Sequence, residues 1–504
     1  MDVSYIKLMA KYEAIQFRRG WIFKLFVLIV VGINVSQLFI QGNFVRNEWY
    51  WMALPSSFPY FQALCFNMVQ VLFVIFAVHE VLSREKRDTE AALLVHPISN
   101  MERNFGQVLG IAKVVLLTCL VSMVFSMLVN LFASDSPFSL WIYIFYFVTL
   151  VLPGFVLSVG MAMSLLVWGK NRVMVSLVLI FVLGVVGLYL YDIGNGFFDI
   201  TTRALPNMFS DVTGHVNLWC YLLQRLAWLL GGTGLLFWAI GFSNRLPNCF
   251  KSVKNTRMVG IICIVFWACT GVLYFLLHIC EIDVRKEYVR TFERYIGEPT
   301  GDLESLSLVF RQSGDYFTGD CELILKNATG EKMNRLLLFL NPDLAVKRVI
   351  VRGQEIPFVR DHQVLNVDMP LDVKDSVKLR VEYTGKIDGR ICYLDIPDEE
   401  YYQTSGNIGF FRLGKQNAFL GKKQTLLIPE CLWYPVTCSP VNPVMPWDTR
   451  KNFTRYTLSV VGETDRTVIS QGVQTRHGDT LRFTNEERLT GITLCAGDYE
   501  KKSV

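Results

Sequence analysis

Residues 84–100 of this chain read Arg84-Glu85-Lys86-Arg87-Asp88-Thr89-Glu90-Ala91-Ala92-Leu93-Leu94-Val95-His96-Pro97-Ile98-Ser99-Asn100. They join two long apolar runs, yet they carry both charges and an apolar pair. If the segment is helical, Glu90, Leu93 and Leu94 share one face, because residues three and four apart are neighbours on a helix. That face has no lipid to enter and is typical of a helix that binds a groove on another protein. The alternative is a solvated loop that is basic only because of its side of the membrane.

The composition places the chain in a membrane. Hydrophobic residues make up 52% of the sequence and charged residues only 18%, which is too apolar for a single soluble core of 504 residues. The long apolar runs fall within residues 21–280, whereas residues 301–504 are more polar and alternate in the manner of strands. The net charge of +5 comes mostly from short loops. It therefore reports orientation, and we expect no nucleic-acid partner.

Crossing a hydrocarbon layer of roughly 30 Å takes about 20 helical residues, and seven segments are long enough. We predict spans near Trp21–Ile40, Phe61–Leu82, Val108–Phe132, Leu140–Trp168, Val173–Tyr191, Leu218–Phe242 and Val259–Ile279. Pro153-Gly154 should kink the fourth span, and Gly231-Gly232-Thr233-Gly234 should either loosen the sixth span or let it pack closely against a neighbour.

Lys and Arg gather in alternate loops, and cytoplasmic loops retain such residues. The basic residues flanking the first two spans on one side are Lys7, Lys11, Arg18, Arg19, Arg84, Lys86, Arg87 and Arg103. The loops between them on the other side carry almost none. We expect a multi-pass protein of the bacterial cell (inner) membrane with a cytoplasmic amino terminus, and with seven spans its carboxy-terminal domain is periplasmic or extracellular.

The domain boundaries follow from these patterns. Residues 1–20 mix apolar and basic side chains, which is typical of a helix lying along the headgroups, although a solvated basic leader is the alternative. A transmembrane domain follows at 21–280, a charged stalk at 281–300, and a domain of alternating apolar residues at 301–504. The predicted fold is an α-helical polytopic membrane domain followed by an all-β, antiparallel, extracytoplasmic sandwich or saddle.

Polar side chains inside the spans are candidates for a transport path. Two pairs, each three residues apart, are Asn34 with Gln37 and Asn67 with Gln70. Because lipid offers them no partner, they should face other helices or a wet path. Simple interhelical hydrogen bonds are the alternative for each amide. Lys113 and Arg225 lie within a few turns of span ends, so snorkelling accounts for both.

The 84–100 segment resembles the coupling helix of ABC transporter type-2 permeases, in which Arg-Glu, Thr-Glu, Leu-Leu and Pro-Ile-Ser follow one another after the second span. Asp88, Asn100 and Gln107 depart from that pattern. The resemblance implies a separate ATPase subunit that grips this helix, a second permease copy (identical or related), an amino-terminal elbow helix, and short half-buried helices at 192–217 that close the exit. The implied coupling residues are Glu85, Thr89, Glu90, Leu93, Leu94, Pro97 and Ile98.

The outer domain resembles the amino-terminal β-domain of the aminopeptidase N family of zinc peptidases, as found in bacterial permease–aminopeptidase fusions. The matching motifs are Leu340-Asn341-Pro342, Tyr383-Thr384-Gly385, Trp433-Tyr434-Pro435, Ser470-Gln471-Gly472 and Gly491-Ile492-Thr493-Leu494. The sequence stops near where that family's catalytic domain would begin. The zinc motif His-Glu-x-x-His is missing, since His79-Glu80 has no second histidine one turn later. We therefore predict no catalytic and no metal-binding residues.

These observations favour the permease subunit of an ABC exporter of unknown cargo, which binds no cofactor itself and depends on ATP used by its partner. The main alternative is a membrane-anchored β-domain that presents substrate to, or scaffolds, a separate zinc aminopeptidase. A permease–peptidase fusion whose outer half has lost its function is a third. Residues 409–416 match the spacing of a phosphate-binding loop except for Gln416, and we interpret that match as accidental. Pairing of Cys431 with Cys438 stays open.

Overall fold

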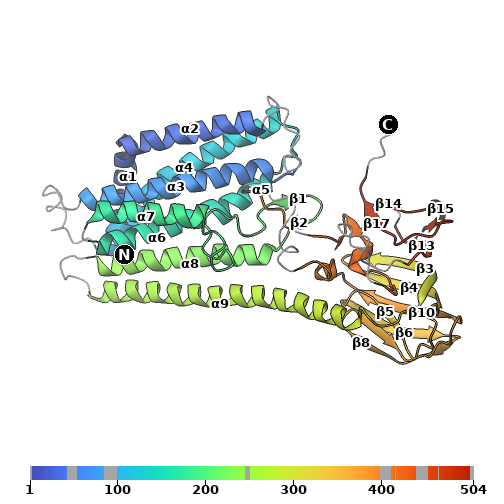
Figure 1. Ribbon diagram of the computed structural model, residues 1–504. Coiled ribbons are helices and arrows are strands. Elements are labelled where there is room, and N and C mark those ends of the chain that lie inside the picture. Colours follow the sequence, from blue (N-terminus) through green and yellow to red (C-terminus); the bar gives the residue numbers. More distant parts are fainter. Residues whose placement is uncertain are drawn as a thin grey trace. The chain divides into compact units, whose positions relative to one another are not determined.

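The computed structural model describes residues 3–41, 54–84, 99–169, 171–243, 250–397, 410–414, 416–438, 452–463 and 465–499. These form two compact units (Figure 1). The helical unit comprises Met1–His278 and Gly406–Gly414, and the β unit comprises Ile279–Ser405 and Lys415–Val504. A helical membrane part and a β-rich domain are thus confirmed. The short segment that ends at Gly414 belongs with the helices although it lies between two parts of the β unit in sequence.

The helical unit is a bundle of long helices. Its helices are α1 (Val3–Arg19), α2 (Trp21–Gln41), α3 (Ser57–Arg84), α4 (Asn100–Ala133), α5 (Leu140–Tyr146), α6 (Leu152–Trp168), α7 (Arg172–Leu188), α8 (Leu218–Phe242) and α9 (Phe250–Tyr295), which continues into the β unit. Within the described residues, six helical segments are long and apolar enough to cross a membrane. The fifth predicted span corresponds to α7, which is apolar but only 17 residues long. Seven crossings and their orientation therefore stay predictions.

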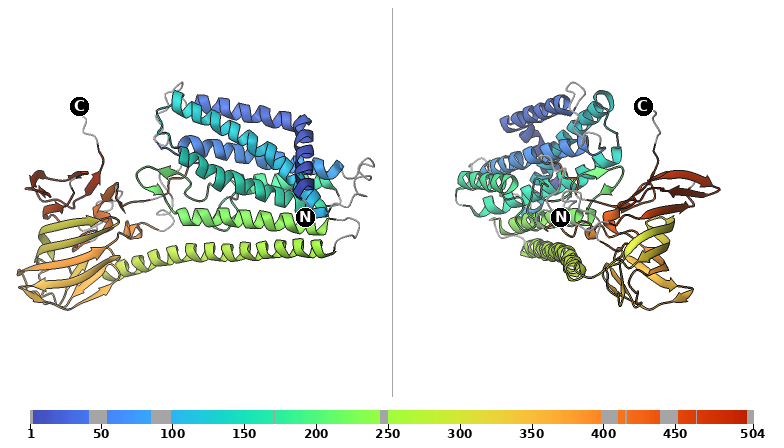
Figure 2. Two further views of the ribbon diagram at one scale, coloured as in Figure 1. Left: turned by 180° about the vertical axis from the view of Figure 1, so that it is seen from behind. Right: turned by 45° about the vertical axis from the view of Figure 1, so that its right-hand side comes forward.

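Helix α1 runs across the ends of the other helices, as the darkest-blue helix in the left view of Figure 2. It packs on α4 where that helix lacks side chains. A Cβ added at Gly110 would lie 2.8 Å from the carbonyl oxygen of Ala10. Tyr5 and Leu8 remain exposed on α1, beside its basic residues. This distribution suits the interfacial helix predicted for residues 1–20.

The fourth span is interrupted as the sequence predicts. A π-helical turn, Phe147–Val151, separates α5 from α6, and Pro153 follows in the first turn of α6. Proline has no N–H to donate to the preceding turn, which favours such an interruption. Helix α6 then meets α8 closely, since a Cβ added at Gly160 would lie 2.1 Å from the carbonyl oxygen of Gly232. Small residues allow this backbone approach between membrane helices.

The β unit contains three sheets. The largest has the order β15-β16-β13-β3-β4-β10-β6-β7, the second β11-β12-β17-β14, and the third β5-β9-β8. Their bounds are β3 Asp302–Ser313, β4 Tyr316–Lys326, β5 Leu336–Phe339, β6 Leu344–Val351, β7 Gln354–Glu355, β8 Phe358–Asp361, β9 Val364–Val367, β10 Ser376–Gly385, β11 Phe419–Leu420, β12 Thr425–Leu427, β13 Arg455–Val461, β14 Thr467–Ser470, β15 Val473–His477, β16 Thr480–Thr484 and β17 Leu494–Gly497.

One strand pair differs from the antiparallel pattern that we expected. Strands β13 and β3 are parallel, with Leu458 opposite Leu308. Parallel pairing needs a long connection, and the strands between β3 and β13 in sequence supply one. Alternate residues of these strands are buried, as a sheet with one covered face requires.

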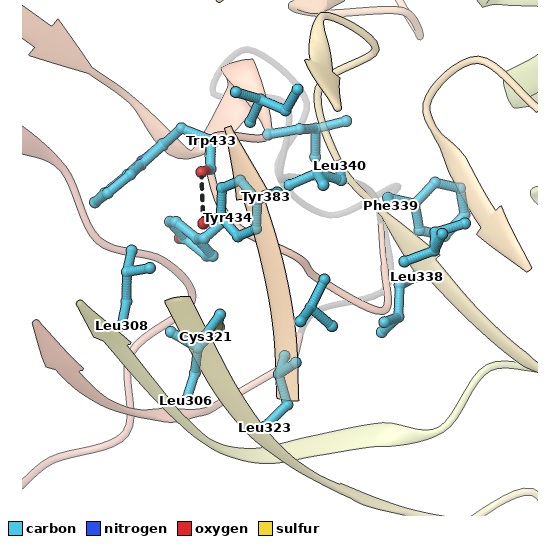
Figure 3. Packing of buried hydrophobic residues seen from close by; sticks show 14 of the residues in the cluster. Leu306, Leu308, Cys321, Leu323, Leu338, Phe339, Leu340, Tyr383, Trp433 and Tyr434 are labelled. Carbon is cyan, nitrogen blue, oxygen red and sulfur yellow. Dashed lines mark hydrogen bonds between the residues drawn. The ribbon is translucent and has the colours of Figure 1, made fainter. Parts of the chain in front are cut away.

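The core of the β unit is built around aromatic side chains (Figure 3). Tyr383 of β10 donates its hydroxyl hydrogen to the carbonyl oxygen of Trp433 at 3.1 Å. The fully buried Arg285 of α9 donates to the carbonyl oxygens of Arg390 and Cys392 at 2.8 and 3.0 Å, which fixes the end of α9 to this unit. Cys431 donates its thiol hydrogen to the carbonyl oxygen of Ile428 and is a free thiol, so it is not paired with Cys438 here.

Candidate functional site

The seven predicted coupling residues lie outside the described residues. They are Glu85, Thr89, Glu90, Leu93, Leu94, Pro97 and Ile98. The two stems of that segment are described, and both are fixed to neighbouring helices. On the first stem, Arg84 at the end of α3 forms an ion pair with the buried Glu13 of α1.

The second stem begins with a capping box at the start of α4. The Ser99 hydroxyl accepts a hydrogen bond from the Glu102 backbone N–H (3.2 Å), and the Glu102 carboxylate accepts one from the Ser99 N–H (3.0 Å). The amide of Asn100 donates to the carbonyl oxygen of Ser243, just after α8, at 3.1 Å. The first stem is thus bonded to α1, and the second to the chain just after α8.

The four transport-path candidates all make hydrogen bonds between elements. Asn34 of α2 accepts from the Ser122 hydroxyl of α4 at 2.8 Å, and Gln37 donates to the carbonyl oxygen of Phe58 at 3.2 Å.

Within α3, Gln70 donates to Asn67 Oδ1 at 2.8 Å. Gln70 also donates to the carbonyl oxygen of Val151 at 2.8 Å, and Asn67 donates to that of Ile200 at 3.4 Å. These bonds account for the placement of all four amides. Their role in a transport path stays a prediction.

Residues 192–217, together with Phe410–Gly414, cover the end of the helical unit where α3 and α8 begin; we call this assembly the cap. The prediction of short half-buried helices at residues 192–217 is wrong. Residues 192–217 form turns and a small hairpin of β1 (Phe209–Ser210) and β2 (Gly214–His215). Gly194, Asn195 and Gly196 have successive φ angles of 62°, 53° and 81°. Such left-handed backbone ends a helix and favours turns.

A buried polar cluster holds the cap to α3. The Tyr60 hydroxyl lies 2.7 Å from the Thr202 hydroxyl, and the Asn207 amide donates to Tyr60 Oη at 2.8 Å and to the carbonyl oxygen of Thr202 at 2.6 Å. Thr202 has a φ of 59°, which costs a β-branched residue about 1–3 kcal/mol. The strain persists because Tyr60 and Asn207 hold Thr202 from two sides.

Phe410–Gly414 binds this cluster mainly through its backbone. The carbonyl oxygen of Phe410 accepts from Tyr60 Oη and from the Asn207 amide, both at 2.9 Å. The backbone N–H of Arg412 donates to Asn207 Oδ1 at 2.9 Å, and the Arg412 carbonyl oxygen accepts from the Asn207 N–H at 2.8 Å. Phe411 packs its ring against Tyr60 and Phe61 at centroid distances of 5.6 and 6.4 Å.

Sequence reasoning missed this contact. It treated residues 409–416 as an accidental resemblance to a phosphate loop. The signal that could have found it is the adjacent pair Phe410-Phe411, which fits no strand alternation in the polar domain around it.

Burial shifts the pKa of two titratable groups in the cap. Burial raises the pKa of Asp199, against the hydrogen bonds that its carboxylate accepts from Thr201 and Ala204. Burial lowers the pKa of His215 from 6.5 to about 4, and the charge of Arg225 adds to the effect. His215 is therefore neutral at pH 7.

Arg225 overturns the expectation of snorkelling. Its side chain is only 2% exposed, and it lies over the rings of Tyr221 and Trp228, at 4.7 and 4.2 Å from the ring centroids. Lys113, by contrast, is exposed. Snorkelling requires the charged end to reach water, and the buried guanidinium of Arg225 does not. Gln224 and Trp228, on the same helix, donate to the carbonyl oxygens of Gly196 and Phe197.

In the part of the chain that the structure describes, no three His, Cys, Asp or Glu residues group to hold a metal ion. The His79 ring nitrogen Nδ1 instead lies 3.0 Å from the Ser176 hydroxyl.

No protein-family model matches this chain, and no curated protein does. Solved structures with partial similarity include the M1 zinc metallopeptidase from Deinococcus radiodurans, with 17% identity over 40% of this chain and 43% of that one, and a TM-score of 0.29. Native leukotriene A4 hydrolase from Saccharomyces cerevisiae has 15% identity over 40% of this chain and 30% of its own, with a TM-score of 0.26. This chain thus spans less than half the length of either protein, and a likeness of this size supports no functional conclusion.

Proposed function

We propose that this chain is the membrane-spanning permease subunit of an ABC exporter, which couples ATP hydrolysis by a separate ATPase to outward movement of a cargo. One observation carries the proposal. Helix α3 runs without interruption from Ser57 to Arg84 and links the stem of the 85–98 segment to the cap. Arg84 lies at one end of it, and Tyr60, which binds the cap, lies near the other.

The two ends are far apart. At 1.5 Å per residue, the 24 steps from Tyr60 to Arg84 span about 36 Å, enough to cross the hydrocarbon layer. A helix of this length moves largely as one body. A push on the 85–98 segment would therefore reach the cap through α3, whereas a simple anchor would need no connection between the two ends.

The test uses the full chain co-expressed with a candidate ATPase subunit from the same genome. We expect Leu93→Asp with Leu94→Asp to abolish co-purification, because the sequence predicts that both leucines lie on the face that binds the ATPase. The control is Lys113→Gln, which removes an exposed charge elsewhere on α4. Undiminished co-purification of the double variant would refute the proposed interface, and a zinc peptidase found in place of an ATPase would favour the anchoring role.

A second variant separates binding from coupling. Glu13→Gln breaks the ion pair at the stem without altering the segment that the ATPase would bind. We expect the ATPase to stay bound, and its stimulation by the permease to fall several-fold. Equal stimulation by the variant and the natural chain would argue against force transmission through this stem.

A further inference from the structure

Arg225 carries a charge that the described residues leave without a hydrogen-bonded partner. Its three guanidinium nitrogens, Nε, Nη1 and Nη2, are all shielded from solvent, and none of them has a hydrogen-bond partner among those residues. A guanidinium presents five N–H donors in a fixed fork that matches a carboxylate or a phosphate. Aromatic rings on two sides attract the charge but accept none of these hydrogens in the plane of the fork.

Asp199 is an acidic residue that interacts electrostatically with Arg225, but it is not the hydrogen-bonded partner of the guanidinium. Its Oδ1 accepts from the Thr201 N–H and hydroxyl at 2.8 and 2.6 Å, and its Oδ2 accepts from the Ala204 N–H at 2.8 Å. Its carboxylate is therefore engaged within its own turn. A buried guanidinium that is left unpaired is costly, and such groups inside membrane proteins mark sites of function.

The surroundings of Arg225 are apolar and aromatic. Cys220 and Ala227, on the same helix as Arg225, belong to a compact apolar cluster with Phe197, Leu205 and Tyr274. Three side-chain bonds from α8 and α9 hold the turn that contains Phe197: Gln224 donates to the Gly196 carbonyl oxygen, Trp228 to the Phe197 carbonyl oxygen at 3.1 Å, and Tyr274 to the Asn195 carbonyl oxygen at 2.6 Å. All three must break before the turn can leave α8.

We infer that Arg225 binds the anionic group of an amphiphilic ligand, whose apolar part lies against the Phe197–Tyr274 cluster once the Gly196–Phe197 turn opens. The shared chemistry is one acidic group joined to an apolar body. An acidic membrane phospholipid and a free amphiphilic acid both have it. Naming this ligand as the exported cargo rests on the proposed function; its binding to Arg225 does not.

The test measures ligand binding to the purified full-length protein without ATP or ATPase. The probes are laurate, its neutral counterpart dodecanol, and nanodiscs of phosphatidylglycerol or phosphatidylcholine. Affinity comes from the rise in the unfolding temperature with probe concentration, since a ligand that binds only the folded state stabilises it. The variants are Arg225→Met and Arg225→Lys. The matched control is Arg257→Met, because Arg257 also lies over a ring, Phe242, yet donates to the Gly241 carbonyl oxygen at 2.9 Å.

We expect at least one acidic probe to bind the natural protein at least tenfold more tightly than its uncharged or zwitterionic counterpart. Arg225→Met should remove that preference, and Arg257→Met should keep it. Arg225→Lys retains the charge and should retain part of the preference, which also covers the case in which the Met variant does not fold. Selective binding of laurate identifies a free acid, and that of phosphatidylglycerol a lipid.

The inference is overturned if neither acidic probe is preferred, or if Arg225→Met keeps the preference. A second test of the inference compares unfolding temperatures and needs no ligand. Removal of an uncompensated buried charge should leave the unfolding temperature of Arg225→Met equal to or above that of Arg257→Met. Loss of ATPase co-purification in other experiments leaves these binding results unchanged, so the failure of one proposal is distinguishable from the failure of the other.

Discussion

Replacement of Asn207 by alanine should release Phe410–Gly414 from the cap. The Asn207 side chain has four hydrogen-bond partners there. Its two N–H hydrogens are shared among Tyr60 Oη, the Thr202 carbonyl oxygen and the Phe410 carbonyl oxygen, and its Oδ1 accepts from the Arg412 N–H. Its side chain is fully buried. Truncation to alanine therefore leaves the buried partners of Asn207 without hydrogen bonds, and water does not readily take its place.

The magnitude follows from those partners. The Phe410 carbonyl oxygen keeps its bond from Tyr60, so the Arg412 N–H and the Thr202 carbonyl oxygen lose most. Each unsatisfied buried group costs about 1–3 kcal/mol, which gives about 3 kcal/mol in total. Since 1.36 kcal/mol is a factor of ten, the docked segment should open roughly a hundred times more often.

Hydrogen–deuterium exchange of the peptide that contains residues 410–414 measures this opening, because the Arg412 N–H is the donor in question. We expect exchange roughly a hundredfold faster in Asn207→Ala. The matched control is Asn130→Ala, which removes another buried asparagine of the helical unit, one with a single long bond of 3.5 Å to Tyr143. Exchange at 410–414 within twofold of the natural protein in Asn207→Ala, or equally faster in both variants, would refute the reasoning.

Three further predictions test the packing and charge of the two units. Gly160→Ala should lower the unfolding temperature of the detergent-solubilised protein by several degrees, at a cost of about 1–3 kcal/mol, because its Cβ meets the Gly232 carbonyl oxygen; Gly184→Ala, with open space around it, should not. His215 has a folded-state pKa of about 4 against 6.5 unfolded, so the unfolded state takes up the proton first. Stability should fall by about 3 kcal/mol as the pH drops from 6.5 to 4, and His215→Gln should flatten that dependence in thermal unfolding. Arg285→Met should destabilise the β unit by about 3 kcal/mol in denaturant titrations, since it strands buried carbonyl oxygens, whereas a change within 0.5 kcal/mol would exclude that role.

The bundle could be predicted from the sequence because its determinants are local. The expected span Leu218–Phe242 agrees with α8 to the residue, and Leu140–Trp168 agrees with α5, its π-helical turn and α6 taken together. Hydropathy over about 20 residues suffices for this, since lipid forces each backbone group to bond within its own helix. The alternation of buried residues in β3 and β13 could also be predicted from the sequence. Their parallel pairing could not, because it depends on how the chain connects the strands.

The cap could not be predicted, because its contacts are not local. Asn207 and Phe410 are 203 residues apart in sequence, and neither belongs to a periodic pattern. Thr202 holds a left-handed backbone that only its tertiary partners stabilise. The position of Arg225 near the end of its span predicts snorkelling. Its burial depends instead on tertiary contacts that the sequence alone does not predict.

The cap joins three features that arise separately in the sequence. Tyr60 belongs to α3, whose opposite end leads into the proposed coupling segment. Gly196 and Phe197 accept hydrogen bonds from Gln224 and Trp228, which flank Arg225 on α8, and Asn207 holds both Tyr60 and Phe410. If α3 shifts, the bonds of Tyr60 to Thr202 and Phe410 change together, since one hydroxyl serves both. Release of Phe410–Gly414 and loosening of the turns over Arg225 should then be coupled. Laurate bound at Arg225 should accordingly speed hydrogen exchange of residues 410–414, and Arg225→Met should abolish that response. Unchanged exchange at saturating laurate, in a protein that binds it, would show that the two parts of the cap move independently.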